Sequence, residues 1–145
     1  MRTFLLDTSC MVAAVCAWHE HHEAARREIE QRLASGESMV AAAPALVETY
    51  AVLTRLPSPH RLMPEQALSL LEANFMNKIR VVALDGKSYK DLLHQAPENG
   101  ISGGRTYDAV IAECALKAGA ANILTFNENG FRSFASPRLS IIVPV

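Results

Sequence analysis

The chain lacks the features of a membrane-spanning or disulfide-stabilised protein. No apolar run approaches the roughly 20 residues that a membrane span needs, and the apolar stretch after Arg2 is interrupted at Asp7, which argues against a signal peptide. The 3 cysteines, Cys10, Cys16 and Cys114, form no C-x-x-C pair, so neither a disulfide framework nor a zinc site is indicated. We therefore expect a cytoplasmic protein with reduced thiols and no membrane partner.

An excess of charge of one sign is also missing. Lysine and arginine total 14 against 15 acidic residues, which gives a net charge of −1. This balance excludes a uniformly basic nucleic-acid-binding coat, so contacts with phosphate groups must come from a local patch or a bound metal ion. Of the 145 residues, 50% are hydrophobic and 20% are charged, which is typical of one globular domain covering residues 1–145.

Short apolar runs alternate with longer segments of helical periodicity. Strands that alternate with helices predict an α/β fold with a mainly parallel sheet covered on both faces. Such sheets bind ligands beyond the carboxyl ends of their strands. The expected strands are residues 2–6, 38–42, 80–84, 122–126 and 139–143, and the expected helices are 8–16, 20–34, 44–56, 64–74, 86–96 and 105–118.

Aspartate is scarce, and two aspartates occupy unusual positions. Asp7 directly follows the first expected strand, and Asp108 lies in the first turn of the last expected helix. Each has an ordinary explanation. Asp7 could be a turn or cap residue, and Asp108 could interact favourably with the helix dipole. Asp108, however, shares a helix face with Ile111 and Ala115, so we expect it to face the core side of the helix.

Glu48 repeats this pattern about one turn into the helix that Pro44 opens. It aligns with Ala51 and Val52 on a face that is otherwise apolar. Burial of a carboxylate is costly unless a positive group compensates it. A core glutamate with satisfied hydrogen bonds is the ordinary alternative.

The carboxyl end of the first strand and the starts of the helices lie at the same edge of a parallel sheet, so these three acids can converge there. Asn127, directly after the strand at 122–126, would join them. Crowded carboxylates raise one another's pKa unless a cation lies between them. Oxygen ligands of this kind suit Mg²⁺ or Mn²⁺, whose typical use is phosphoryl chemistry.

Four segments that contain these residues carry a family resemblance. In their order and spacing, the chain resembles the PIN-domain ribonucleases, in particular the VapC-type toxins of bacterial toxin–antitoxin pairs. The resemblance implies a three-layer α/β/α fold with a five-stranded parallel sheet, and a Mg²⁺- or Mn²⁺-dependent endoribonuclease. The segments are LLDTS (5–9), PALVETYAVLTR (44–55), GGRTYDAVIAECALKAGA (103–120) and ILTFNENGF (123–131).

The resemblance also implies roles for individual residues. Asp7, Glu48 and Asp108 match the acidic catalytic and metal-site residues. Asn127 matches a fourth metal-site position that is often Asp in the wider family, so this site has one negative charge fewer. Ser9 matches a small hydroxyl residue that contacts water, RNA or the site acids. The implied reaction is in-line attack of a metal-activated water on an RNA phosphodiester, with Asp108 or Glu48 accepting the proton.

The implied partners are an RNA substrate, a second copy of the chain in a homodimer, and a cognate VapB-like antitoxin. The antitoxin tail is expected to enter the active groove, and the antitoxin rather than this chain is expected to bind operator DNA.

Other polar features are less specific. Arg105 lies where a loop enters a helix near Asp108, so it could contact a phosphate or pair with Asp108.

In the segment WHEHHE (18–23), His19 and His22 have a spacing possible for metal ligands, but solvated histidines or a role beside the groove are favoured. Trp18 has packing as its ordinary role and stacking on a base as the alternative.

Two alternatives of other classes remain. A non-catalytic interaction module on the same fold is favoured only by Asn127. A phosphatase that forms an aspartyl phosphate on Asp7 would generally need a second acid two positions later, where Ser9 stands. A dinucleotide-binding role lacks the glycine fingerprint after the first strand.

Overall fold

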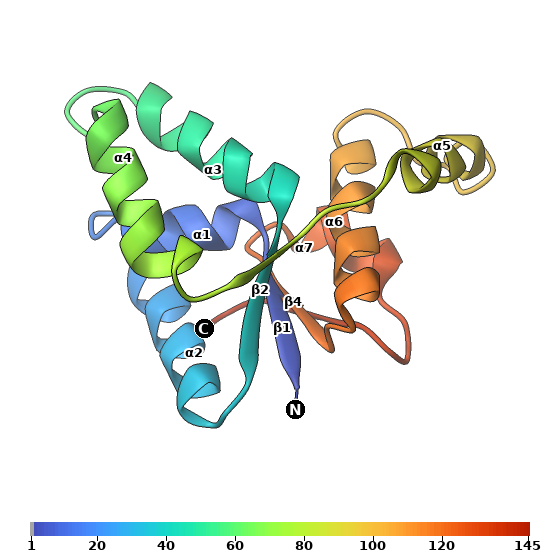
Figure 1. The fold of residues 1–145 in the computed structure, drawn as a ribbon, viewed down its shortest axis with the longest axis horizontal. Coiled ribbons are helices and arrows are strands. Elements are labelled where there is room, and N and C mark those ends of the chain that lie inside the picture. Colours follow the sequence, from blue (N-terminus) through green and yellow to red (C-terminus); the bar gives the residue numbers. More distant parts are fainter. Residues whose placement is uncertain (1) are drawn as a thin grey trace.

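The computed structural model describes residues 2–145, and one sheet of five parallel strands forms its centre (Figure 1). The strand order is β3-β2-β1-β4-β5, so β1 is central and the order reverses beside it. Every neighbouring pair is parallel. The strands are β1 (Thr3–Leu6), β2 (Ser38–Ala42), β3 (Arg80–Val82), β4 (Asn122–Leu124) and β5 (Ser140–Ile142).

Helices cover both faces of this sheet, which confirms the three-layer α/β/α fold (Figure 1). The first group packs together on one side and consists of α1 (Thr8–Val15), α2 (His22–Ala34), α3 (Ala43–Arg55) and α4 (Pro64–Leu71), which the π-helical turn η1 (Glu72–Met76) continues. The second group consists of α5 (Gly86–Gln95), α6 (Arg105–Ala118) and α7 (Glu128–Phe131), followed by the 3-10 turn η2 (Arg132–Phe134).

The central strand is buried on both faces, as expected for a parallel sheet between two helical layers. Phe4, Leu5 and Leu6 have no exposed surface. The three cysteines are buried as free thiols. None of the helices in the described part of the chain is long and apolar enough to cross a membrane.

The expected elements are confirmed, with differences at their ends. α2 begins at His22 rather than at residue 20, because residues 17–21 form turns in which His22 N–H donates to the His19 carbonyl (3.0 Å). α6 ends at Gly119 as predicted, since Gly119 adopts a left-handed conformation (φ 70°) that costs glycine little. The short elements α7 and η2 were not predicted.

The sheet register brings the ends of three strands to one edge. Leu6 of β1 pairs with Ala41 of β2 and with Leu124 of β4. The backbone N–H of Asp7 continues this ladder by donating to the Leu124 carbonyl (3.1 Å). Because Asp7 follows β1 and Thr125 follows β4, the pairing places these two residues side by side.

Candidate active site

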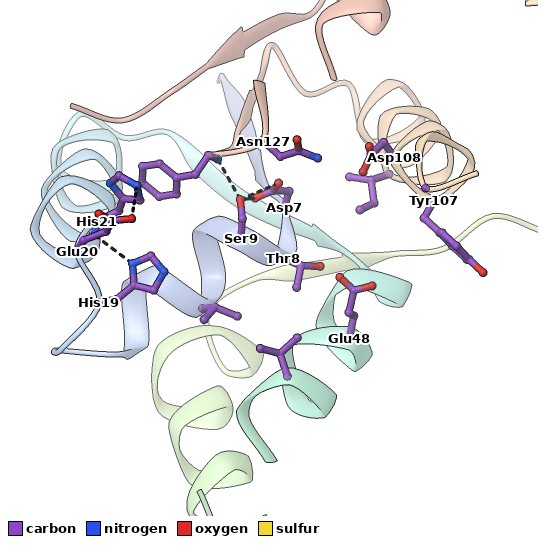
Figure 2. Close-up of a pocket in the computed structure, with 15 residues that line it drawn as sticks. Asp7, Thr8, Ser9, His19, Glu20, His21, Glu48, Tyr107, Asp108 and Asn127 are labelled. Carbon is purple, nitrogen blue, oxygen red and sulfur yellow. Dashed lines mark hydrogen bonds and ion pairs between the residues drawn. The ribbon is translucent and has the colours of Figure 1, made fainter. Parts of the chain in front are cut away.

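A cleft of about 610 Å³ lies at this edge of the sheet. Asp7 comes from the end of β1, Glu48 from α3 and Asp108 from the first turn of α6, and Asn127 follows β4. Figure 2 shows these four side chains around one space. The structure thus brings together all four residues singled out from the sequence. No lysine or arginine occurs among the described residues that line the cleft, so the three carboxylates and Glu20 meet no fixed cation there.

Asp7 is the most buried of these acids, with 3% of its surface exposed. It is the N-cap of α1, where its Oδ1 accepts from the backbone N–H of Cys10 (2.9 Å). Burial raises its pKa to about 6, and hydrogen bonds from Thr125, Cys10 and Ser9 act in the opposite direction. Asp7 is therefore both a helix cap and a buried carboxylate of the cleft with a raised pKa.

Two hydroxyl groups fix the Asp7 carboxylate against β4. Ser9 Oγ donates to Asp7 (2.8 Å) and accepts from the backbone N–H of Phe126 (3.0 Å). Thr125 Oγ1 donates to Asp7 Oδ2 and accepts from the backbone N–H of Asn127 (2.8 Å). The predicted contact of Ser9 with the site is thus a hydrogen bond to Asp7. The sequence interpretation missed Thr125, which is completely buried.

Asp108 couples the other two acids electrostatically. Partial burial raises its pKa, and the Glu48 carboxylate raises it further, whereas Arg105 acts in the opposite direction. The charge of Asp108 in turn contributes to the raised pKa of Asp7. Glu48 lines the cleft beside Val52, but its expected burial is wrong. Its side chain is exposed, because the buried face of α3 carries Ala45, Thr49 and Leu53.

Gly130 is a site residue that sequence reasoning did not identify. A Cβ atom at this buried position would lie less than 3 Å from Asp108 Oδ2 and from Asn127 Nδ2. The side chains of Asp108 and Asn127 therefore occupy the space that any other residue at 130 would fill. Glycine at this position lets α7 approach α6 closely enough to complete the cleft.

We expect the Gly130→Ala substitution to displace Asp108 and Asn127 and to lower Mn²⁺ affinity at least tenfold, as measured by calorimetry. The free energy of unfolding should change little, since the obstructing atoms are ends of movable side chains. Gly104→Ala is the matched control, because Gly104 also lines the cleft but a Cβ there meets nothing within 4 Å. Equal Mn²⁺ affinities of the two variants would contradict this role of Gly130.

The residues present fit a divalent cation held partly through water. Their oxygen donors are those that Mg²⁺ prefers, and the pKa values of Asp7 and Asp108 stay raised although hydrogen bonds to Asp7 and the charge of Arg105 act against this. The Thr8 hydroxyl in the same cleft is buried without a hydrogen-bond partner. Among residues 2–145, no three His, Cys, Asp or Glu side chains converge as a ready-made ligand set. Mg²⁺ commonly keeps several waters and binds one or two carboxylates directly, which agrees with this open arrangement.

Arg105 makes contacts outside the cleft, whereas His19 lies beside the carboxylates, as the role favoured for the histidines requires. Arg105 does not line the cleft, because its guanidinium donates to the Gly100 carbonyl (3.3 Å) and to Ser133 and lies over the Phe134 ring. His22 contacts the Ala13 carbonyl through Nδ1 (2.9 Å), whereas His19 lies before the helix begins, so these two histidines do not share a helix face.

The whole chain resembles known proteins. The PIN domain family matches residues 4–137. Ribonuclease VapC40 of Mycobacterium tuberculosis is 38% identical over 135 residues, which cover 93% of this chain and 94% of that protein. The chain therefore belongs to the PIN-domain family and, within it, to the VapC-type proteins, as the sequence predicts.

Solved structures show the same fold at lower identity. VapBC2 from Rickettsia felis, bound to a DNA fragment from their promoter, matches with a TM-score of 0.70 and 20% identity over 99% of both chains. VapC20 of Mycobacterium tuberculosis, a Sarcin-Ricin loop cleaving toxin, matches with a TM-score of 0.68 and 18% identity, covering 90% of this chain and 94% of VapC20.

Proposed function

We propose that this chain is a Mg²⁺- or Mn²⁺-dependent endoribonuclease that acts as the toxin of a toxin–antitoxin pair. The observation that carries the proposal is the group of three carboxylates in a cleft lined by no lysine or arginine among the described residues. Its relative VapC40 is a ribonuclease, and the match covers nearly the whole chain. A non-catalytic module would gain nothing from three mutually repelling acids at this edge.

Asp7, Glu48 and Asp108 would hold the metal ion, with the Asn127 carbonyl oxygen as a fourth ligand. When bound, the ion would activate water and stabilise negative charge on the phosphodiester. Asp7 is held in place by its hydrogen bonds and orients the site. Asp108, which lines the same cleft, accepts the proton of the attacking water on a carboxylate oxygen.

The test is cleavage of total RNA by the purified chain with Mg²⁺, with Mn²⁺ and with EDTA, beside the Glu48→Gln variant. We expect discrete fragments with either metal, none with EDTA, and at least a tenfold lower rate for Glu48→Gln, since Glu48 is exposed and its loss removes only charge from the cleft. Glu128→Gln is the control, because Glu128 is also exposed but pairs with Arg132 (3.0 Å). Metal-independent cleavage, or equal rates of the two variants, would refute the metal site.

We further propose an antitoxin partner and a homodimer. The antitoxin is supported by the likeness to VapBC2, and its tail would cover the cleft. Apolar side chains exposed on and beside α3 and α4 are available for a dimer contact, among them Val47, Met63 and Leu68. Light scattering of the chain alone and with its antitoxin measures both assemblies.

A further inference from the structure

Five aromatic side chains form a continuous row that ends in the cleft. Trp18 stacks on His60 with ring centroids 4.1 Å apart and 20° between the planes, and His21 stacks on Phe126 at 4.4 Å and 10°. His19 connects the two pairs, with centroids 5.8 Å from Trp18 and 5.6 Å from His21. We call these residues the aromatic row, in the order His60, Trp18, His19, His21 and Phe126.

The aromatic row is continuous with the carboxylate site. His19, His21 and Phe126 line the same cleft as the acids. In Figure 2, His19 and His21 lie at the end of the cleft away from Glu48 and Asp108. Ser9 joins the two parts, since it accepts from the Phe126 backbone N–H and donates to Asp7. A ligand seated on the row is therefore next to the site of the proposed reaction.

Core packing does not explain the aromatic row. Trp18 has 48% of its surface exposed, and His19, His21 and Phe126 are only partly buried. Burial, followed by the neighbouring His21, lowers the pKa of His19, which favours the uncharged form of this ring. The row thus presents ring surfaces to the solvent at the mouth of an acidic cleft.

The charge of the cleft limits how RNA can be held there. RNA-binding surfaces usually gain affinity by pairing phosphates with lysine and arginine, but neither occurs among the described lining residues. Stacking of bases on aromatic rings is the other main source of affinity for single strands, and it tolerates any sequence. A base is free to stack in this way only when it is not already stacked in a duplex.

We propose that the aromatic row binds unpaired nucleobases of the RNA substrate beside the phosphodiester to be cut. This inference rests on the proposed ribonuclease function. It assigns substrate affinity to Trp18, His19 and His21, whereas the chemistry stays with the carboxylates.

Trp18 is the single tryptophan of the chain, so its fluorescence reports directly on the row. The probes are hexa-adenylate RNA, an abasic ribose-phosphate strand of equal length, and an RNA duplex, each titrated in EDTA to prevent metal-dependent cleavage. Hexa-adenylate should quench the fluorescence, whereas the abasic strand and the duplex should not. Equal quenching by the abasic strand would overturn the proposal, because it would require no base.

Binding of labelled hexa-adenylate, followed by anisotropy, tests the individual residues. Trp18→Ala and His21→Ala should each weaken binding about 5- to 150-fold, the range for loss of one stacked base. Trp18→Phe should restore most of the affinity. Tyr89→Ala is the matched control, since Tyr89 is a part-exposed aromatic residue that does not line this cleft. Circular dichroism melting identifies any variant that fails to fold.

Steady-state cleavage separates this proposal from the ribonuclease proposal. Loss of a ring from the row should raise KM and leave kcat within about threefold, whereas Glu48→Gln should lower kcat. If Glu48→Gln loses activity while the row variants keep the parent KM and affinity, the row proposal fails and the ribonuclease stands.

If no RNA is cut with any metal but hexa-adenylate still quenches Trp18, the ribonuclease proposal fails and base binding stands. Unchanged RNA affinity with lost antitoxin binding would instead assign the row to a protein partner.

Discussion

The Asp108→Asn variant should cleave RNA at least 100-fold more slowly than the parent in Mg²⁺ while folding as well or better. Asn has nearly the same shape but can neither accept the proton of the attacking water nor supply charge to a cation. Burial and Glu48 disfavour the charged form of Asp108, so removing the charge relieves an unfavourable interaction at neutral pH. Single-turnover cleavage measures the rate, and chemical denaturation measures the free energy of unfolding.

Asp91→Asn is the matched control for this experiment. Asp91 is an exposed aspartate on α5 that pairs with Lys87 (2.9 Å) outside the cleft. Its loss should leave both cleavage and stability close to those of the parent, because exposed ion pairs contribute little. Parental cleavage by Asp108→Asn would show that the reaction uses another site.

The Thr125→Val variant should shift the acidic limb of the pH–rate profile to higher pH. The Thr125 hydrogen bond stabilises the ionised form of Asp7, so its loss raises the pKa of Asp7 above about 6. If ionised Asp7 is needed to hold the metal, activity falls most near pH 6 and recovers toward pH 8. The loss of this buried hydrogen bond should also destabilise the fold by about 1–3 kcal/mol.

Thr125→Ser is the control, because it keeps the hydroxyl group that serves both Asp7 and the Asn127 backbone N–H. Profiles of kcat/KM against pH, recorded for the parent and both variants at one metal concentration below saturation, decide the question. An acidic limb that does not move in Thr125→Val would exclude control of Asp7 by this hydroxyl.

The strand pattern predicted the fold because each strand is a short apolar run with a turn or cap residue at its end. The same logic placed Asp7, Asp108 and Asn127 at one edge, since parallel strands and their following helices share that edge. The same reasoning placed Glu48 at this edge, but its expected burial was wrong. The buried face of α3 includes Thr49 but not the adjacent Glu48, so the Glu48 side chain is exposed.

Thr125 and Gly130 could not be identified in the same way, because their roles depend on neighbours distant in sequence. Thr125 was assigned to the strand at 122–126, but β4 ends at Leu124. The position of Thr125 directly after a strand that pairs with β1 could have indicated its role beside Asp7. Recognising this required knowledge of the strand order. Gly130 matters only because the side chains of Asp108 and Asn127 occupy the space beside it.

The strand order also determines when during synthesis the site can form. Asp7 is made early, but one of the two hydroxyls that orient it belongs to Thr125, whose backbone N–H donates in turn to the Ile142 carbonyl of β5 (3.0 Å). A chain emerging from the ribosome therefore holds Asp7 and Glu48 long before β4 and β5 can pair. The site stays incomplete until Asp108, Thr125 and Asn127 have been translated, so the growing chain lacks the full set of side chains with which to attack the RNA around it.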